Sequence, residues 1–161
     1  MKFLTGIGQD SHRFLPEKGE KPCIIGGLTF EDAPGLDADS DGDVIFHAIC
    51  NAITSLTHVP ILGKIAIDLC HKEGITDSRI YLEKALETLG SRKVEHVALT
   101  IEGKRPKFQK RSEEIRQSVA SVLHLTPEQV GITFTSGDGL TAFGRGEGLM
   151  CYCMLTVSMN Q

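Results

Sequence analysis

Apolar side chains recur at two spacings along the chain, and these spacings predict its elements. Short apolar runs bounded by turn residues predict strands at 2–14, 22–30, 94–102, 130–136 and 149–158. A charged loop containing Pro and Gly separates the first two segments. We therefore expect these two to pair with each other as a hairpin.

Three other segments have the three-to-four-residue apolar spacing of amphipathic helices. The first begins near Gly42, because Ser40 and Asp43 resemble a capping box. The second ends at Gly90, and the third follows Pro106. Their apolar stripes are, in order, Ile45, Ile49, Ala52 and Leu56; Leu82, Ala85, Leu86 and Leu89; and Ile115, Val119, Val122 and Leu123.

Strands interleaved with helices predict an α+β fold, in which a mixed β-sheet has helices packed on one face. The other face of the sheet then needs cover. Aromatic residues make up only 6% of the chain, so we expect oligomerisation through that face.

The 161 residues suit a single domain spanning 1–161. Hydrophobic residues at 40% and charged residues at 24% are typical of soluble globular proteins. A net charge of −4 argues against a nucleic-acid partner but allows one small phosphate-bearing ligand. The apolar runs are too short for a membrane partner, and the N-terminus turns polar early, so we expect a cytoplasmic protein.

Five cysteines form no Cys-x-x-Cys pair, which fits neither a disulfide framework nor a cysteine-rich zinc site. We interpret them as small buried hydrophobic residues. Cys151 and Cys153 share one face of the final strand, which leaves a metal or redox role open for that pair.

The clearest candidate chemistry is a metal site. Asp10 and His12 are two apart in a strand, so their side chains leave the same face. His47 projects away from the apolar stripe of the first helix, which argues against a core role. One carboxylate and two imidazoles with a fourth position open form a catalytic rather than structural zinc site. A surface hydrogen-bonding pair is the alternative for Asp10 and His12.

The alternating acidic residues Asp37, Asp39, Asp41 and Asp43 resemble the start of a calcium-binding EF-hand loop, but the glutamate that closes such a loop is missing. We interpret Ser40 and Asp43 as cap residues, and expect Asp39 or Asp41 to face the metal cleft.

Three further segments have phosphate-binding chemistry. Lys104–Lys107 places three positive charges at a strand exit, although a solvated loop explains it equally well. Thr133–Gly139 combines hydroxyls, a glycine turn and a carboxylate, as does an ordinary turn. Gly144–Gly148 alternates glycine with opposite charges and leads into a strand, so it is not a dinucleotide fingerprint.

Six motifs in this order resemble the 2-C-methyl-D-erythritol 2,4-cyclodiphosphate synthase family. The early Asp-x-His and the Ser-Asp-Gly-Asp-Val-x-x-His element are the most specific of them, and the resemblance spans nearly the whole chain. The motifs are Gly8–His12, Ile24–Gly27, Ser40–His47, Thr76–Arg79, Arg105–Lys107 and Gly144–Gly148.

The resemblance implies a homotrimer with active sites between subunits and a cytidine-diphosphate substrate. Zn²⁺, or another divalent transition metal, would be held by Asp10, His12 and His47, and Mg²⁺ or Mn²⁺ by Asp138. The residues that would contact substrate are Asp39, Ser40, Gly63, Asp68, Gly103, Pro106, Lys107, Thr135, Ser136 and Arg145. Ser136 and Asp39 would take the transition-state positions.

The departures from the family pattern concern substrate handling rather than zinc. Asp39 stands where the family has a phosphate-contacting His, and Ile61–Gly63 replaces Asp-Ile-Gly. Ala66–Asp68 replaces Phe-Pro-Asp, and Thr135–Asp138 shortens the acid of Thr-Thr-x-Glu by one carbon.

By resemblance, the expected reaction is conversion of 4-diphosphocytidyl-2-C-methyl-D-erythritol 2-phosphate to the 2,4-cyclodiphosphate with release of CMP, in non-mevalonate isoprenoid synthesis. This is the work of a cyclising phosphorus–oxygen lyase. The alternatives are a metal-dependent phosphohydrolase and a non-catalytic metal- or nucleotide-binding homologue. The changes at Asp39 and Ile61 would favour the non-catalytic homologue.

Overall fold

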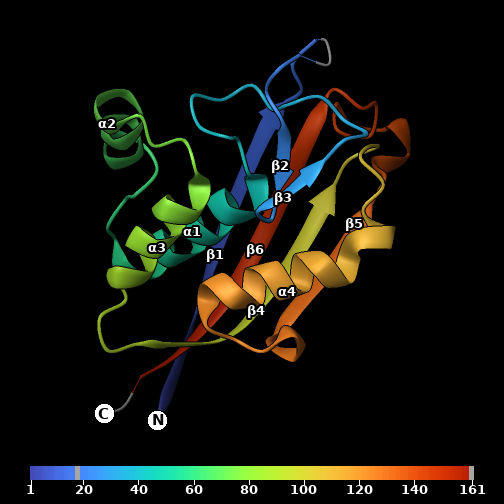
Figure 1. Cartoon of the computed structure of the whole chain (residues 1–161). Coiled ribbons are helices and arrows are strands. Elements are labelled where there is room, and N and C mark those ends of the chain that lie inside the picture. The colour runs from blue at the N-terminus through green and yellow to red at the C-terminus, as the bar shows by residue number, and fades with distance from the viewer. Residues whose placement is uncertain (17–18, 160–161) are drawn as a thin grey trace.

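A four-stranded mixed sheet forms the framework of the computed structural model, which describes residues 1–16 and 19–159 (Figure 1). The strand order is β1-β6-β4-β5. Both neighbours of β6 run antiparallel to it, whereas β4 and β5 are parallel. The strands are β1 Lys2–Arg13, β4 Lys93–Glu102, β5 Val130–Thr135 and β6 Gly148–Met159. The predicted α+β class with a mixed sheet is confirmed.

Three helices lie on one side of this sheet, as predicted: α1 Val44–Thr57, α3 Ser78–Glu87 and α4 Ser112–Leu123 (Figure 1). α1 and α4 contact the strands, and α3 packs mainly on α1. A further helix, α2 Lys64–Glu73, stands at one end of the molecule. The apolar spacing used above does not predict α2, which buries a single residue, Leu69. Short 3₁₀ turns occupy Gln109–Arg111, Pro127–Gln129 and Gly137–Gly139.

The core lies between the sheet and the helices. Alternate residues of β6 point into it, because successive strand side chains leave opposite faces; they are Leu149, Cys151, Cys153, Leu155 and Val157. All five cysteines are free, and four are fully buried, as expected of small hydrophobic residues. Burial raises the pKa of the Cys151 and Cys153 thiols, which keeps them protonated and poor metal ligands.

The expected hairpin between 2–14 and 22–30 is wrong. β1 instead pairs with β6 from Lys2 to Arg13. Residues 22–30 fold back on themselves as β2 Cys23–Ile25 and β3 Leu28–Phe30. Gly26 and Gly27 make this two-residue turn possible, since both have positive φ, a conformation that side chains disfavour.

The face of the sheet opposite the helices carries exposed apolar side chains. Ile7 and Met154 are cross-strand partners on it and are 60% and 53% exposed. Phe3 and Tyr152 extend the same face. No helix in residues 1–16 and 19–159 has the length and apolar character needed to cross a membrane.

Candidate metal centre and substrate pocket

Strand β1 contributes two side chains to the candidate site through its alternation. Asp10 and His12 point to the helix side, as do Gly6 and Gly8. A Cβ on Gly6 would overlap the backbone of α1 at Ala52, and one on Gly8 would overlap it at both Ala48 and Ala52. Glycine at these positions therefore allows α1 to approach β1 closely enough for a helix side chain to reach Asp10.

The start of α1 is held by Asp43, its N-cap, which is fully buried. The carboxylate accepts hydrogen bonds from the backbone N–H groups of Ile45 and Phe46 at 3.1 and 3.2 Å. It also accepts those of Gly26 and Gly27 at 2.9 and 2.7 Å, which joins the helix to the β2–β3 turn. Burial, and then the nearby charge of Asp41, raise the pKa of Asp43 to about 7.

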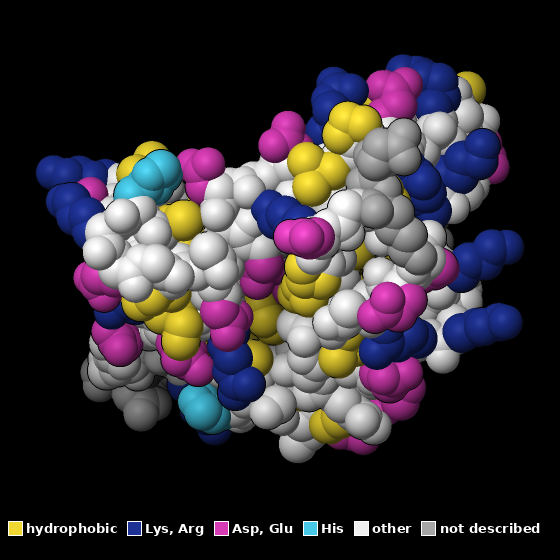
Figure 2. Space-filling view, turned by 45° about the horizontal axis from the view of Figure 1, so that its top comes forward, with side chains coloured by type: hydrophobic (Ala, Val, Ile, Leu, Met, Phe, Trp, Pro, Cys, Tyr) yellow, Lys and Arg dark blue, Asp and Glu magenta, His cyan; other side chains and the backbone are white. Residues whose placement is uncertain are grey.

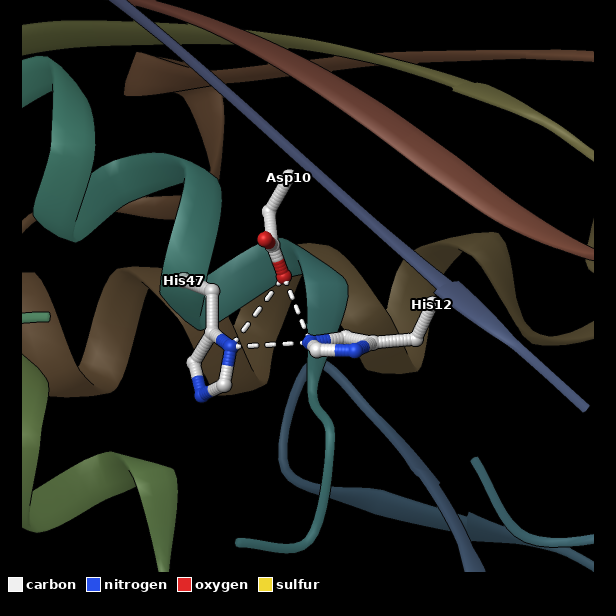
Figure 3. Close-up of side chains that lie close together, drawn as sticks. All are labelled: Asp10, His12 and His47. Atoms are coloured by element: carbon white, nitrogen blue, oxygen red, sulfur yellow. Dashed lines mark hydrogen bonds and ion pairs between the residues drawn. The ribbon is translucent and has the colours of Figure 1, made fainter. Parts of the chain in front are cut away.

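His47 lies one turn beyond Asp43 and reaches the two β1 side chains (Figure 3). It is only 6% exposed, so it is more buried than its position on the polar side of the helix predicts. Burial of the whole first half of α1 accounts for this difference, since loops and α3 cover the face that the sequence marks as polar.

The three ligand atoms converge as a metal site requires. Asp10 Oδ2 lies 2.9 Å from His12 Nε2 and 3.1 Å from His47 Nδ1, and the two nitrogens are 3.3 Å apart (Figure 3). Ligand atoms around a tetrahedral zinc ion with bonds of about 2.0–2.1 Å are separated by roughly 3.3 Å. The donor set and its spacing therefore fit a divalent transition metal, as predicted.

Asp10 and His12 are electrostatically coupled. Burial acts to raise the pKa of Asp10, but hydrogen bonds and charge from His12 and His47 outweigh it and lower that pKa from 3.8. For His12, burial acts to lower the pKa, but the hydrogen bond and charge of Asp10 raise it above 6.5. In the absence of metal the pair therefore favours a protonated imidazole beside a carboxylate.

A cavity of about 240 Å³ opens beside the candidate ligands Asp10, His12 and His47. It contains several predicted site residues, namely Asp39, Ser40 and Gly63, together with the three ligands. Leu62, Ala66 and Ile67, which lie in the segments that depart from the family pattern, also line it. Sequence reasoning missed its remaining walls, for which no spacing gives a signal: Ala38, Cys70 and Tyr81.

Asp39 has a partner that the sequence did not indicate. Its Oδ2 lies 3.2 Å from Nε2 of His71 on α2, and both side chains are largely exposed. The guanidinium of Arg105 stacks over Phe14, 4.8 Å from the ring centroid.

A second group of predicted residues lies together at the carboxyl ends of the parallel strands β4 and β5. The backbone N–H of Gly103 donates to the carbonyl of Thr135 at 3.0 Å. Beyond it, Ser136 Oγ lies 3.1 Å from Asp138 Oδ1, and both side chains are exposed. Lys107 is exposed after the buried Pro106. Figure 2 shows Lys and Arg gathered mainly on its right side, the side of β5 in Figure 1.

Two further predicted residues do not line the metal cavity. Asp68 lines a separate groove between α2 and α3 and pairs with Lys72 at 3.0 Å. Arg145 is exposed and pairs with Glu147 at 2.9 Å. Within one chain, the metal cavity is therefore lined by neither these side chains nor those at the ends of β4 and β5.

Comparison with known proteins defines the class. Residues 3–158 match the YgbB family, and the chain belongs to this family. The 2-C-methyl-D-erythritol 2,4-cyclodiphosphate synthase of Chlamydia caviae is 55% identical over 157 residues, covering 97% of this chain and 89% of that protein. The synthase of the same name from Chlamydia felis is 56% identical over 156 residues, covering 96% and 89%.

Solved structures agree with this assignment. A 2C-methyl-D-erythritol-2,4-cyclodiphosphate synthase described as its CDP-bound form is 25% identical, has a TM-score of 0.78, and is matched over 96% of this chain and 100% of its own. The resemblance drawn from the sequence motifs is confirmed.

Proposed function

We propose that this protein converts 4-diphosphocytidyl-2-C-methyl-D-erythritol 2-phosphate to 2-C-methyl-D-erythritol 2,4-cyclodiphosphate and releases CMP. The convergence of Asp10, His12 and His47 beside a cavity carries this proposal most directly, in a chain more than half identical to named synthases over nearly its whole length. The reaction supplies a precursor of non-mevalonate isoprenoid synthesis.

The proposed metal is zinc, held by Asp10, His12 and His47. Two imidazoles and one carboxylate leave a coordination position open, which suits catalysis more than structure. A bound zinc ion would supply Lewis-acid polarisation of a phosphate oxygen. The ligands themselves are fixed by the β1 alternation and the α1 cap, so they need little rearrangement to bind it.

The chemistry needs no nucleophile from the protein. An oxygen of the substrate's 2-phosphate attacks the β-phosphorus, and the bond from that phosphorus to the oxygen bridging it to the α-phosphate breaks, so CMP leaves with the bridging oxygen. The protein's main task is to hold the substrate folded, since intramolecular positioning is worth about 7–11 kcal/mol. Leu62, Ala66 and Ile67 give the cavity an apolar wall that excludes water from the phosphates.

The group at the ends of β4 and β5 is proposed to hold the nucleotide. Gly103, Pro106 and Lys107 would receive the cytidine and its phosphate, with the lysine offsetting charge on the departing CMP. Hydroxyls of Thr135 and Ser136 would donate to the diphosphate. The exposed carboxylate of Asp138 fits Mg²⁺ or Mn²⁺, which commonly binds through one or two carboxylates plus substrate phosphates.

Assembly as a homotrimer with active sites between subunits would complete the pocket, with the whole chain acting as one domain. The single-chain cavity of about 240 Å³ is small for a diphosphocytidyl ligand, and the nucleotide group does not line it. The apolar sheet face around Ile7, Tyr152 and Met154 supports association with further copies of the chain. Asp68 and Arg145 would then contact substrate in the active site between subunits.

Asp39 and Ser40 are proposed to face the substrate phosphates, because both line the metal cavity. A cytoplasmic location is also proposed. All five cysteines are free, which is typical of a reducing compartment.

Product analysis tests this function. The zinc-loaded protein is incubated with the authentic substrate and magnesium, and the phosphorus-containing products are followed by ³¹P NMR. Equal amounts of CMP and the cyclic diphosphate are expected. Linear phosphate products would identify a phosphohydrolase instead, and tight binding without turnover would identify a non-catalytic homologue.

A further inference from the structure

The second ring nitrogen of His47, Nε2, has buried hydrogen-bond partners of its own. Nδ1 faces Asp10, whereas Nε2 lies 2.7 Å from Oγ of Ser78. Ser78 is fully buried at the first position of α3. Its hydroxyl in turn contacts the carboxylate of Asp41, so a chain of side chains runs from the loop before α1 to the imidazole.

The direction of these hydrogen bonds follows from counting donors. Asp41 Oδ1 accepts the backbone N–H of Asp43 at 3.0 Å, and its Oδ2 accepts that of Ser78 at 3.0 Å. A carboxylate only accepts, so the Ser78 hydroxyl must give it its one hydrogen. The Ser78 oxygen can then only accept from Nε2–H of His47. With its single ring proton on Nε2, a neutral His47 has its lone pair on Nδ1, the atom that faces Asp10 and the proposed metal position.

We propose that Asp41 and Ser78 are positioning residues that fix His47 as the Nε2–H tautomer and so present Nδ1 to the metal. This inference rests on the proposed metal centre. Ser40 Oγ also approaches Nε2, but at 3.4 Å, and it accepts the backbone N–H of Gly42. The shorter bond to Ser78 therefore sets the ring's orientation. Partners of this kind typically change metal affinity by about 10–100-fold.

Zinc affinity gives the first test, measured by competition with a chromophoric chelator. Ser78→Ala removes the acceptor for Nε2–H and is expected to weaken zinc binding about 10–100-fold. Asp41→Asn is expected to weaken it as well, because an amide can donate to Ser78 and let the hydroxyl donate to Nε2, which moves the ring proton to Nδ1. Ser158→Ala is the matched control: Ser158 is also buried, but it bonds Glu95 and should leave affinity unchanged.

The ring proton gives a readout that a loss of packing would not. In zinc-loaded parent protein, NMR should show His47 bound through Nδ1, with a proton on Nε2 protected from solvent exchange; in Ser78→Ala that proton should exchange fast. Coordination through Nε2 in the parent, or parental affinity and protection in Ser78→Ala, would overturn the inference. If Ser78→Ala does not fold, the spectrum of the parent and the zinc affinity of Asp41→Asn test the inference. A parent that binds no zinc would instead contradict the proposed metal centre.

Discussion

At the scale of single residues, the protonation of Asp10 and His12 would be coupled to binding of the proposed metal. The pKa of His12 is raised above 6.5, so its contribution to stability is complete below that value and is lost as the pH rises through the folded pKa. The pKa of Asp10 is lowered from 3.8, so its contribution is present above that value and is lost in stronger acid. The metal-free pair is therefore most stabilising between these two pH values.

Zinc bound at the proposed site would reverse this pH dependence, because its ligand would be unprotonated His12. Raising the pH from about 6 to about 8 should lower the contribution of the pair to metal-free stability while zinc binding strengthens. We therefore expect the difference in Tm between zinc-loaded and stripped protein to increase over this range. Thermal melts at each pH measure it, with His12→Gln as the variant in which the increase is lost. A difference that shrinks with pH would contradict the coupling.

Asp39 gives a second prediction at this scale. It lines the cavity and, within residues 1–16 and 19–159, its side chain pairs with the exposed His71; an ionised Asp39 would repel substrate phosphates. Asp39→His removes that charge and adds a donor, so kcat/KM should hold or rise. Steady-state kinetics across a magnesium titration provide the measurement. A fall of tenfold or more, about 1.4 kcal/mol, would show instead that Asp39 is functional as it stands.

The sequence predicts the three candidate ligands, which the structure brings together, better than the residues that support them. Asp10 and His12 follow from strand alternation, and their meeting with His47 follows from the family resemblance. Ser78 lies 31 residues beyond His47, and no local pattern connects them. Its motif is visible in the sequence, but its role needs the packing of α3 against the loop before α1.

At the scale of elements, the close approach of α1 to β1 decides whether the ligands meet. Gly8→Ala would drive a methyl group into the helix backbone at Ala48, and such overpacking typically costs about 1–3 kcal/mol. We expect that loss of stability in urea unfolding, together with weaker zinc binding. Gly131→Ala is the control, since a Cβ on this β5 glycine has ordinary space, 3.8 Å from the His96 ring. Equal stability of the two variants would contradict this role of Gly8.

Sequence patterns predict some helices and strand pairings of this fold and miss others. α1 and α4 were predictable because each has a strong apolar stripe against the sheet. α2 was not, because it buries little. The hairpin prediction assumed that neighbours in sequence pair, whereas β1 gains a twelve-residue ladder with β6 at the other end of the chain.

At the scale of the whole molecule, the apolar sheet face should be covered by other copies of the chain. Light scattering should give the mass of a trimer for the parent. Met154→Asp places a charge on that face and should shift the mass towards the monomer, whereas Val59→Asp, outside the sheet, should not. A monomeric parent that is fully active would contradict the proposed assembly and its shared sites.

Metal at Asp10, His12 and His47 is the requirement common to the proposed reaction and to the positioning role of Ser78. The most direct measurement is the zinc content of purified protein, compared between the parent, His47→Ala and the exposed-histidine control His96→Ala. Two remaining ligands cannot close the site, so we expect about one zinc per chain in the parent and control, and none in His47→Ala. Full zinc retention in His47→Ala, or a parent that takes up none when zinc is supplied, would contradict the metal centre.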